Sequence, residues 1–180
     1  MSASRRRARA KSEHASRMIR GDAARRLRCN RAGMRALLPA ARAHGWVRVA
    51  ADTRVQGALI AMPPWHYPLP PSGLRDQLRA LWGQGFRVRA RWARVFVHLD
   101  ARHPTGPHWY LSTLGVRTAA RGRGLGRALL RALLARADAD ALPCYLETDR
   151  EANLSFYAPE GFAVEQERRV RGVRVWHMVR

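Results

Sequence analysis

The sequence predicts a single mixed α/β domain whose sheet combines antiparallel and parallel strands. Residues 46–62 and 163–179 each alternate apolar and polar side chains on both sides of a short turn, which is typical of antiparallel hairpins. Between them, residues 108–149 read as strand, helix and strand, which is the order of a parallel crossover. A chain of 180 residues that is 47% hydrophobic is long enough to bury one core.

The N-terminal part is predicted to be a basic arm followed by helices. Residues 1–16 are polar and arginine-rich without apolar periodicity, so we expect a disordered arm before one domain at residues 17–180. Across residues 17–43, apolar side chains recur at helical spacing but are interrupted near residues 30–33. This pattern predicts two short helices.

The first hairpin is followed by a long loop and two more helices. Its turn falls at residues 51–54, where the alternation stops. The proline-rich segment 63–73 cannot form a regular helix or strand, because proline lacks the backbone N–H and fixes φ. This loop carries three ring side chains, Trp65, His66 and Tyr67. Helical periodicity then returns at residues 74–82 and 88–99.

The crossover consists of a strand at residues 108–116, a helix at 123–138 and a strand at 142–149. One side of the helix is apolar, with Leu125, Leu129, Leu130, Leu133, Leu134 and Ala137. The opposite side carries Arg123, Arg127 and Arg131. After the crossover, residues 151–162 predict a short helix that turns at Gly161. The closing hairpin is expected to turn at residues 171–172.

The charge of the chain is strongly positive. The formal net charge is +21, and Lys11 is the single lysine, so arginine supplies nearly all of the positive charge. Such a surface attracts nucleic acid, an anionic membrane or an anionic cofactor, although many of the arginines can also be simply solvated.

The cysteines and the hydropathy pattern indicate a cytoplasmic protein without a membrane span. Cys29 and Cys144 lie far apart and lack the paired spacings of a zinc site or a disulfide framework. No apolar run reaches the length of about 18 residues that a membrane span requires, and the basic N-terminus is not followed by the apolar segment of a signal peptide.

Three glycines at alternate positions, Gly122, Gly124 and Gly126, precede and open the crossover helix. In the first turn of a helix the backbone N–H groups lack intrahelical partners, and the helix dipole adds partial positive charge. Bare backbone there lets phosphate oxygens approach, while nearby arginines add charged donors. The segment therefore predicts a pyrophosphate-binding turn, with a purely structural glycine-rich turn as the alternative.

Two other glycine-rich motifs do not fit this turn. The Walker pattern requires Gly-Lys-Ser/Thr after its spacer, and the dinucleotide fingerprint requires G-x-G-x-x-G, whereas this chain has G-x-G-x-G.

The run from Arg121 to Gly126 resembles the Q/R-x-x-G-x-G/A signature of the GNAT superfamily of N-acetyltransferases. Downstream, Asn153, Tyr157 and the Gly161–Phe162 pair resemble the second signature of that superfamily. The resemblance covers residues 108–164. This segment is similar to small-molecule enzymes of the puromycin acetyltransferase kind. The opening strand usual in the family is hard to find, since its region offers only Met18 and Ile19 as apolar residues.

The resemblance implies that acetyl-CoA is the cofactor and lies between two parallel strands that splay apart. It implies that the main chain of Leu114, Gly115 and Val116 runs beside the pantetheine and the thioester. The pyrophosphate would be held by Arg121, Gly122, Arg123, Gly124, Leu125, Gly126 and Arg127. Asn153 would hydrogen-bond the pantetheine arm, and Tyr157 would stand near the thioester sulfur.

These roles agree with the chemistry of acetyl transfer to an amine. The backbone N–H of Val116 can stabilise the oxyanion, and Tyr157 can give a proton to the leaving thiolate. Glu147 is the leading candidate for the base, because Tyr145 and Glu147 should point to one face of their strand. Asp149 and His108 are the other candidates, and no metal is expected.

The expected acceptor is a primary amine of a small molecule, bound near Trp65, His66, Tyr67 and Trp176, in a monomer or homodimer. The alternative for these rings is that they are packed core or edge residues. One alternative is a protein amine, at an N-terminus or a lysine. Another, suggested by the net charge, is a noncatalytic module that binds nucleic acid or another anion, although no recognised nucleic-acid motif is present.

Overall fold

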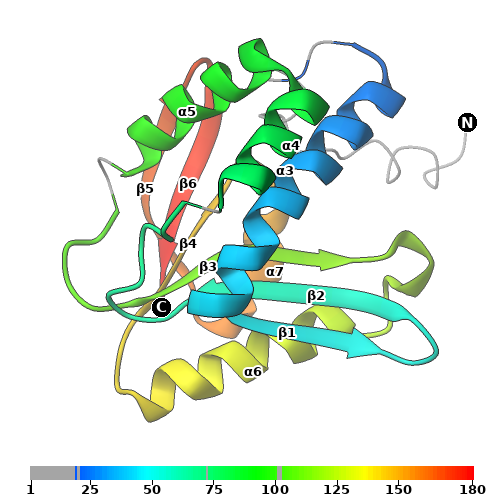
Figure 1. Cartoon of the computed structure of the whole chain (residues 1–180). Helices are drawn as coiled ribbons and strands as arrows, with labels where there is room; N and C mark the ends of the chain where they lie inside the picture. The colour runs from blue at the N-terminus through cyan, green and yellow to red at the C-terminus, as the bar shows by residue number, and fades with distance from the viewer. Residues whose placement is uncertain (1–18, 20, 72, 101–102) are drawn as a thin grey trace, which may run out of the picture.

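The computed structural model describes residues 19, 21–71, 73–100 and 103–180, so the predicted basic arm lies outside the described residues. The described chain forms one six-stranded sheet in the order β1-β2-β3-β4-β6-β5 (Figure 1). The strands are β1 (Trp46–Ala51), β2 (Val55–Met62), β3 (Trp109–Val116), β4 (Cys144–Thr148), β5 (Ala163–Val170) and β6 (Val173–Val179). β3 and β4 are parallel, and the other neighbouring strands are antiparallel, which confirms the mixed sheet.

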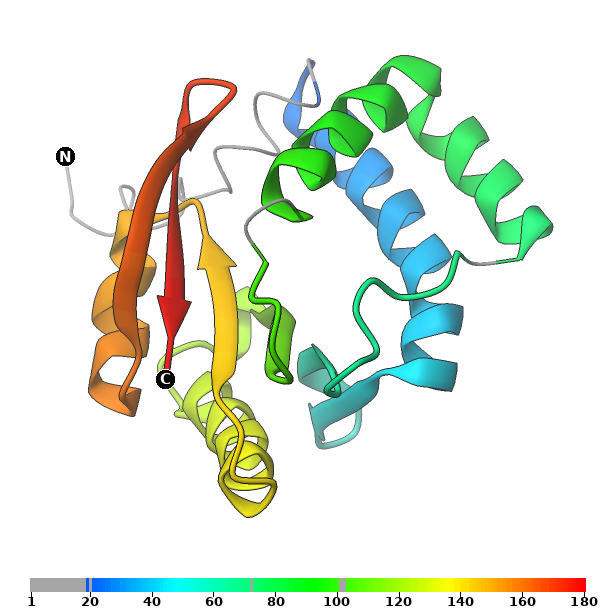
Figure 2. The same ribbon diagram turned by 90° about the vertical axis from the view of Figure 1, so that its left-hand side faces the viewer.

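Helices cover both faces of the sheet. The principal ones are α3 (Ala23–His44), α4 (Leu74–Gln84), α5 (Phe86–Asp100), α6 (Leu125–Ala139) and α7 (Leu154–Tyr157). Figure 2 shows α3, α4 and α5 on one side of the strands and α7 on the other, with α6 beneath the sheet. The main core lies between the sheet and α6, where Leu130 and Leu133 are fully buried against Leu59 and Leu146. A second cluster, including Val88, Val95 and Val175, lies on the opposite face.

The N-terminal helical segment differs from the prediction, because α3 is one helix and not two. Asp22 caps its start by accepting a hydrogen bond from the backbone N–H of Arg25 at 2.7 Å. Gly33 does not interrupt the helix, because it lies where α4 crosses α3 closely. At the same crossing, a Cβ atom added to Gly83 would lie 2.5 Å from the Cβ of Ala32. The glycines therefore permit close helix packing and do not mark a break.

The two predicted hairpins and the predicted crossover are confirmed. β1 and β2 pair antiparallel on either side of residues 52–54, and β5 and β6 turn at Arg171 and Gly172. Both turn residues have positive φ, 51° and 80°, which matches the twist of a tight hairpin.

No strand precedes β1 in the described part of the chain, and most of the region where an opening strand was sought lies outside the described residues. Ile19, at the start of that part, is fully buried in the second cluster. Within the described ranges, no helix combines the length and the apolar character needed to cross a membrane.

Candidate active site

β3 and β4 pair over a short distance and then separate. Their pairing consists of Trp109 with Cys144, Tyr110 with Tyr145, and Leu111 with Leu146. Beyond this point β3 continues along β2 and β4 continues along β6. The parallel strands therefore open into a V after Leu111 and Leu146.

A bulge coincides with the start of this opening. The register between β2 and β3 shifts where Ile60 pairs with Thr113 and Ala61 pairs with Leu111, which leaves Ser112 as an extra residue. A bulge bends the strand that contains it. Leu114, Gly115 and Val116 follow the bulge and pair with β2 on one side, while β4 no longer occupies their other side.

The first turn of α6 lies just after β3 and has free backbone donors. Gly124 is its N-cap, with a left-handed backbone at φ 78°, and it offers no side-chain cap. Gly122 also has a positive φ of 80°. Among the described residues, no acceptor is present for the N–H groups of Leu125, Gly126 and Arg127. Since α3 caps itself with Asp22 and α6 does not, this turn suits an external anion.

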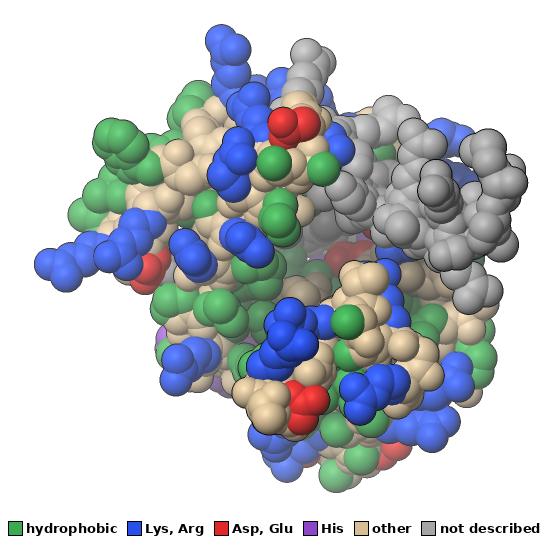
Figure 3. Space-filling view, turned by 90° about the vertical axis from the view of Figure 1, so that its right-hand side faces the viewer, with side chains coloured by type: hydrophobic (Ala, Val, Ile, Leu, Met, Phe, Trp, Pro, Cys, Tyr) green, Lys and Arg blue, Asp and Glu red, His purple; other side chains and the backbone are tan. Residues whose placement is uncertain are grey.

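The arginines around this turn have different surroundings. Arg123 is exposed, and the side chain of Arg121 donates from Nε to the carbonyl oxygen of Val116 at 3.4 Å. Arginine side chains stand on both sides of a hollow on the face drawn in Figure 3, where acidic side chains are few. This distribution of charge favours an anionic ligand.

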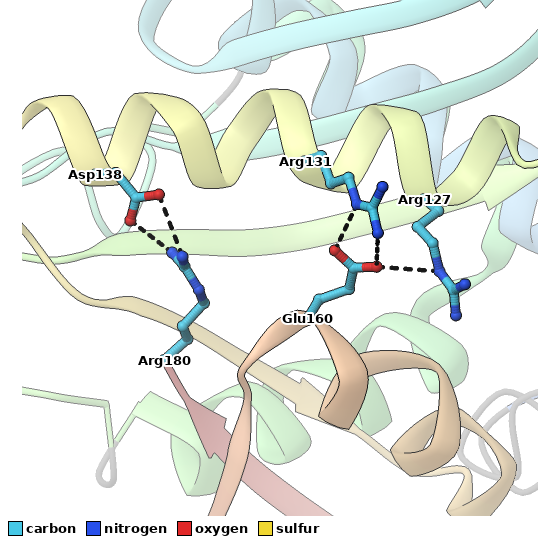
Figure 4. A network of polar contacts seen from close by, with 5 residues as sticks. All are labelled: Arg127, Arg131, Asp138, Glu160 and Arg180. Atoms are coloured by element: carbon cyan, nitrogen blue, oxygen red, sulfur yellow. Dashed lines mark hydrogen bonds and ion pairs between the residues drawn. The ribbon is translucent and has the colours of Figure 1, made fainter.

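Arg127 and Arg131 both contact Glu160 in the segment after α7, as Figure 4 shows. The Nε atoms of Arg127 and Arg131 lie 3.1 and 2.8 Å from oxygens of Glu160, whose side chain is only 6% exposed. The hydrogen bond from Arg131 is the main reason why the pKa of Glu160 is lowered. The three side chains therefore connect α6 to the segment that carries Asn153 and Tyr157.

Asn153 and Tyr157 lie beyond the end of β4. Asn153 donates from Nδ2 to Oγ1 of Thr148 at 2.8 Å, and its Oδ1 accepts no hydrogen bond from the described residues. Tyr157 is 9% exposed and packs edge-on against Phe156 and Phe162. Its hydroxyl makes no hydrogen bond within the described part of the chain, and burial raises its pKa to about 12. A protonated and unengaged phenol is thus available.

Glu147 lies on β4 just past the last pair with β3, on the face opposite α6. The hydroxyl of Tyr110 donates to its Oε2 at 2.8 Å, and that of Tyr145 donates to its Oε1 at 2.9 Å. The second contact agrees with the prediction that Tyr145 and Glu147 share a face. Burial raises the pKa of both tyrosines, so they remain hydrogen-bond donors.

His108, a weaker candidate for the base, already has contacts at both ring nitrogens. Its Nδ1 lies 2.7 Å from the carbonyl oxygen of Gly106, and its Nε2 lies 3.0 Å from Nδ1 of His103. His103 was missed by sequence reasoning. It stacks on Tyr67 with ring centroids 3.7 Å apart and contacts Tyr110 and Tyr145 edge-on.

The predicted acceptor-binding rings do not form one group. Trp65 is 77% exposed, whereas Trp176 is 5% exposed and belongs to the core beside α6. Of the two predictions for Trp176, the core position is the correct one, because strand alternation puts His177, and not Trp176, on the face of Glu147. Within the described ranges, no cluster of three or more His, Cys, Asp or Glu side chains is arranged to hold a metal.

A parallel pair that opens beside an uncapped helix N-terminus suits an enzyme that binds an extended phosphate-containing cofactor. The sequence profile of the Acetyltransferase (GNAT) family matches residues 26–162, and the chain belongs to this family. It is an acetyl-CoA-dependent N-acetyltransferase, with acetyl-CoA as the acetyl donor of the family.

Solved structures share the fold. One from Corynebacterium glutamicum ATCC 13032, described as histone acetyltransferase HPA2 and related acetyltransferase, superposes with a TM-score of 0.65 at 22% identity, over 93% of this chain and 81% of that chain. A GNAT-family protein of Desulfovibrio desulfuricans gives a TM-score of 0.51 at 14% identity, over 83% and 76% of the two chains. At these identities the similarity shows the fold alone.

Proposed function

We propose that the chain acetylates the primary amine of a small molecule by direct attack within a ternary complex. The main support is the opening between β3 and β4 directly beside the free amides of α6. A pantetheine arm that runs along the free side of residues 114–116 would bring its pyrophosphate to those amides. The finer resemblance to enzymes of the puromycin acetyltransferase kind stays a prediction.

The cofactor-binding roles follow the order of the chain. The main chain of Leu114, Gly115 and Val116 lies beside the pantetheine and the thioester. The segment from Arg121 to Arg127 binds the pyrophosphate, with Arg127 also held by Glu160. Asn153 offers its Oδ1 to a pantetheine amide, because its Nδ2 is already bonded to Thr148.

Three groups of the protein take part in the chemistry: the backbone N–H of Val116, Glu147 and Tyr157. Acetyl-CoA supplies the thioester whose carbonyl carbon the amine attacks. The N–H of Val116 stabilises the negative charge that develops on the carbonyl oxygen. Glu147 receives a proton from the amine, directly or through one water, and Tyr157 donates a proton to the departing sulfur.

The charge of the protein favours a small acceptor over a basic protein segment. With a net charge of +21, the chain repels lysine-rich tails at long range, whereas a small amine carries only one or a few charges. The carboxylate of Glu147 provides a local site of opposite sign for such an amine.

A thiol-release assay tests this proposal. The protein is mixed with acetyl-CoA and a panel of polyamines, aminoglycosides, aminonucleosides, amino acids and peptides. We expect CoA release with at least one small primary amine and not with peptides alone. Release only with peptides would indicate the protein-acetylating alternative. No release, combined with a salt-sensitive shift of a labelled nucleic acid duplex, would favour the binding-module alternative.

Replacing Glu147 with glutamine is expected to lower turnover at neutral pH by about a hundredfold or more, the usual size of general base catalysis. The loss should shrink as the pH rises, because an acceptor that is already deprotonated no longer needs the base. The measurement is the pH profile of kcat/KM for Glu147→Gln and for the control Glu151→Gln, which removes an exposed carboxylate at the ion pair with Arg174. An equal loss at every pH would reduce Glu147 to a positioning role.

A further inference from the structure

His103 contacts both of the tyrosines that hydrogen-bond the proposed base, Glu147. It sits on the face of the sheet opposite α6, with its ring centroid 4.6 Å from that of Tyr110 and 4.8 Å from that of Tyr145. These two tyrosines are partners across the β3–β4 ladder, one residue before the strands separate. Both also donate their hydroxyl hydrogens to Glu147. His103 and Glu147 are thus joined through the same two side chains at the mouth of the opening.

For a neutral His108, the hydrogen bonds determine which nitrogen of His103 carries the hydrogen. The carbonyl oxygen of Gly106 can only accept, so Nδ1 of His108 donates to it. With both rings neutral, Nε2 of His108 is then an acceptor and takes a hydrogen bond from Nδ1 of His103. The remaining nitrogen, Nε2 of His103, consequently carries a lone pair.

This lone pair has no partner. Nε2 of His103 is a buried atom without a hydrogen bond among the described residues. Burial lowers the pKa of His103 to about 4, with the neighbouring His108 and His177 acting in the same direction. At neutral pH the ring is therefore an uncharged acceptor, held in place by His108 and by the stacked ring of Tyr67. An unpaired buried acceptor next to a reaction site is what a substrate donor can satisfy.

We propose that Nε2 of His103 accepts a hydrogen bond from the amine that is acetylated and thereby selects primary amines over secondary ones. This inference rests on the proposed function. A neutral primary amine has two N–H groups and one lone pair. One N–H is directed to Glu147 and the other to His103, so that only the lone pair faces the thioester. His103 is a specificity-determining residue in this arrangement, and Glu147 remains the base.

The selectivity follows from the cost of an unpaired acceptor. A secondary amine has one N–H, which it must give to the base Glu147. Nε2 of His103 is then left without a donor, and an extra alkyl group enters the same space. A site that hydrogen-bonds an N–H group of its substrate strongly rejects an analogue that lacks this N–H group. An apolar pocket rejects an extra methyl group less strongly. The discrimination therefore depends on the ring nitrogen and not on pocket size alone.

The test compares the first primary amine that gives thiol release in the panel with its N-methyl derivative. For the parent protein we expect kcat/KM to favour the primary amine by about tenfold or more. The variant His103→Phe keeps a flat ring without an acceptor, and its preference should fall to within about threefold. His98→Phe, at the exposed end of α5, is the control and should keep the parent preference. An unchanged preference in His103→Phe overturns the inference.

A second measurement needs neither activity nor mutation. Nitrogen-15 spectra of the histidine side chains distinguish the two neutral tautomers, and we expect His103 and His108 both to carry hydrogen on Nδ1. A hydrogen on Nε2 of His103 would make that atom a donor and would overturn the inference. Absence of acetyl transfer to every amine would instead count against the proposed function, so the two failures are distinguishable.

Discussion

Replacing Gly124 with valine is expected to weaken acetyl-CoA binding by about tenfold or more, which corresponds to about 1.4 kcal/mol. Gly124 is the N-cap of α6, immediately before three amides that have no acceptor among the described residues. A branched side chain there would stand where phosphate oxygens must approach. Titration of acetyl-CoA into the folded variant measures the effect directly.

Backbone strain is a second consequence of this change and needs a control. Gly124 has a left-handed backbone, in which a residue with a side chain costs about 1–2 kcal/mol. Gly85, between α4 and α5, has a φ of 80° with a ψ of 152°, a backbone that a residue with a side chain adopts even less readily than that of Gly124. A Cβ atom at either position would meet no protein atom within 4 Å. Gly85→Val should therefore lower the melting temperature at least as much as Gly124→Val, without weakening cofactor binding. Equal affinity losses in both variants, or none in Gly124→Val, would contradict the phosphate-binding role.

The parts of the fold that could be predicted are those in which local sequence directly reflects burial. Alternation along residues 173–179 correctly indicated a strand, and the four-residue spacing of Leu129 and Leu133 correctly indicated the buried side of α6. The error at residues 17–43 arose because the interruption of the apolar pattern near residues 30–33 was interpreted as a break between two helices. The role of Gly33 in this stretch depends on the crossing with α4, some fifty residues away, which no local pattern contains.

The candidate site also contains some features that the sequence could predict and others that it could not. The positive φ of Gly122 and Gly124 was foreseeable, because glycine spacing reports a local backbone requirement. The contacts of His103 were not, since they arise only when its loop folds onto Tyr110 and Tyr145. The core position of Trp176 could have been preferred from the sequence, because alternation from His177 assigns Trp176 to the face opposite Glu147.

Replacing Tyr157 with phenylalanine is expected to slow acetyl transfer by about a hundred- to ten-thousandfold, the usual contribution of general acid catalysis. Phenylalanine keeps the contacts with Phe156 and Phe162, and the hydroxyl that is removed has no hydrogen-bond partner in the described part of the chain. Stability and acetyl-CoA affinity should therefore remain close to the parent values.

The raised pKa of Tyr157, about 12, lies above the ordinary thiol pKa of about 8.5, so in water this phenol would be a weak acid toward a thiolate. The neighbouring Cys144 argues otherwise. Burial in the same core raises the pKa of its thiol to about 12 as well. A sulfur that becomes buried beside Tyr157 would have its pKa raised in the same direction, because the loss of solvent disfavours its thiolate.

Single-turnover rates are the appropriate readout for Tyr157→Phe, because slow product release can mask a change in chemistry during steady-state turnover. An acetyl thioester with a more acidic leaving thiol should recover part of the lost rate, since such a thiolate departs without protonation. Both results together would identify the lost group as the acid for the sulfur. Single turnovers within about threefold of the parent rate would show that Tyr157 is not the general acid, and that solvent supplies this proton.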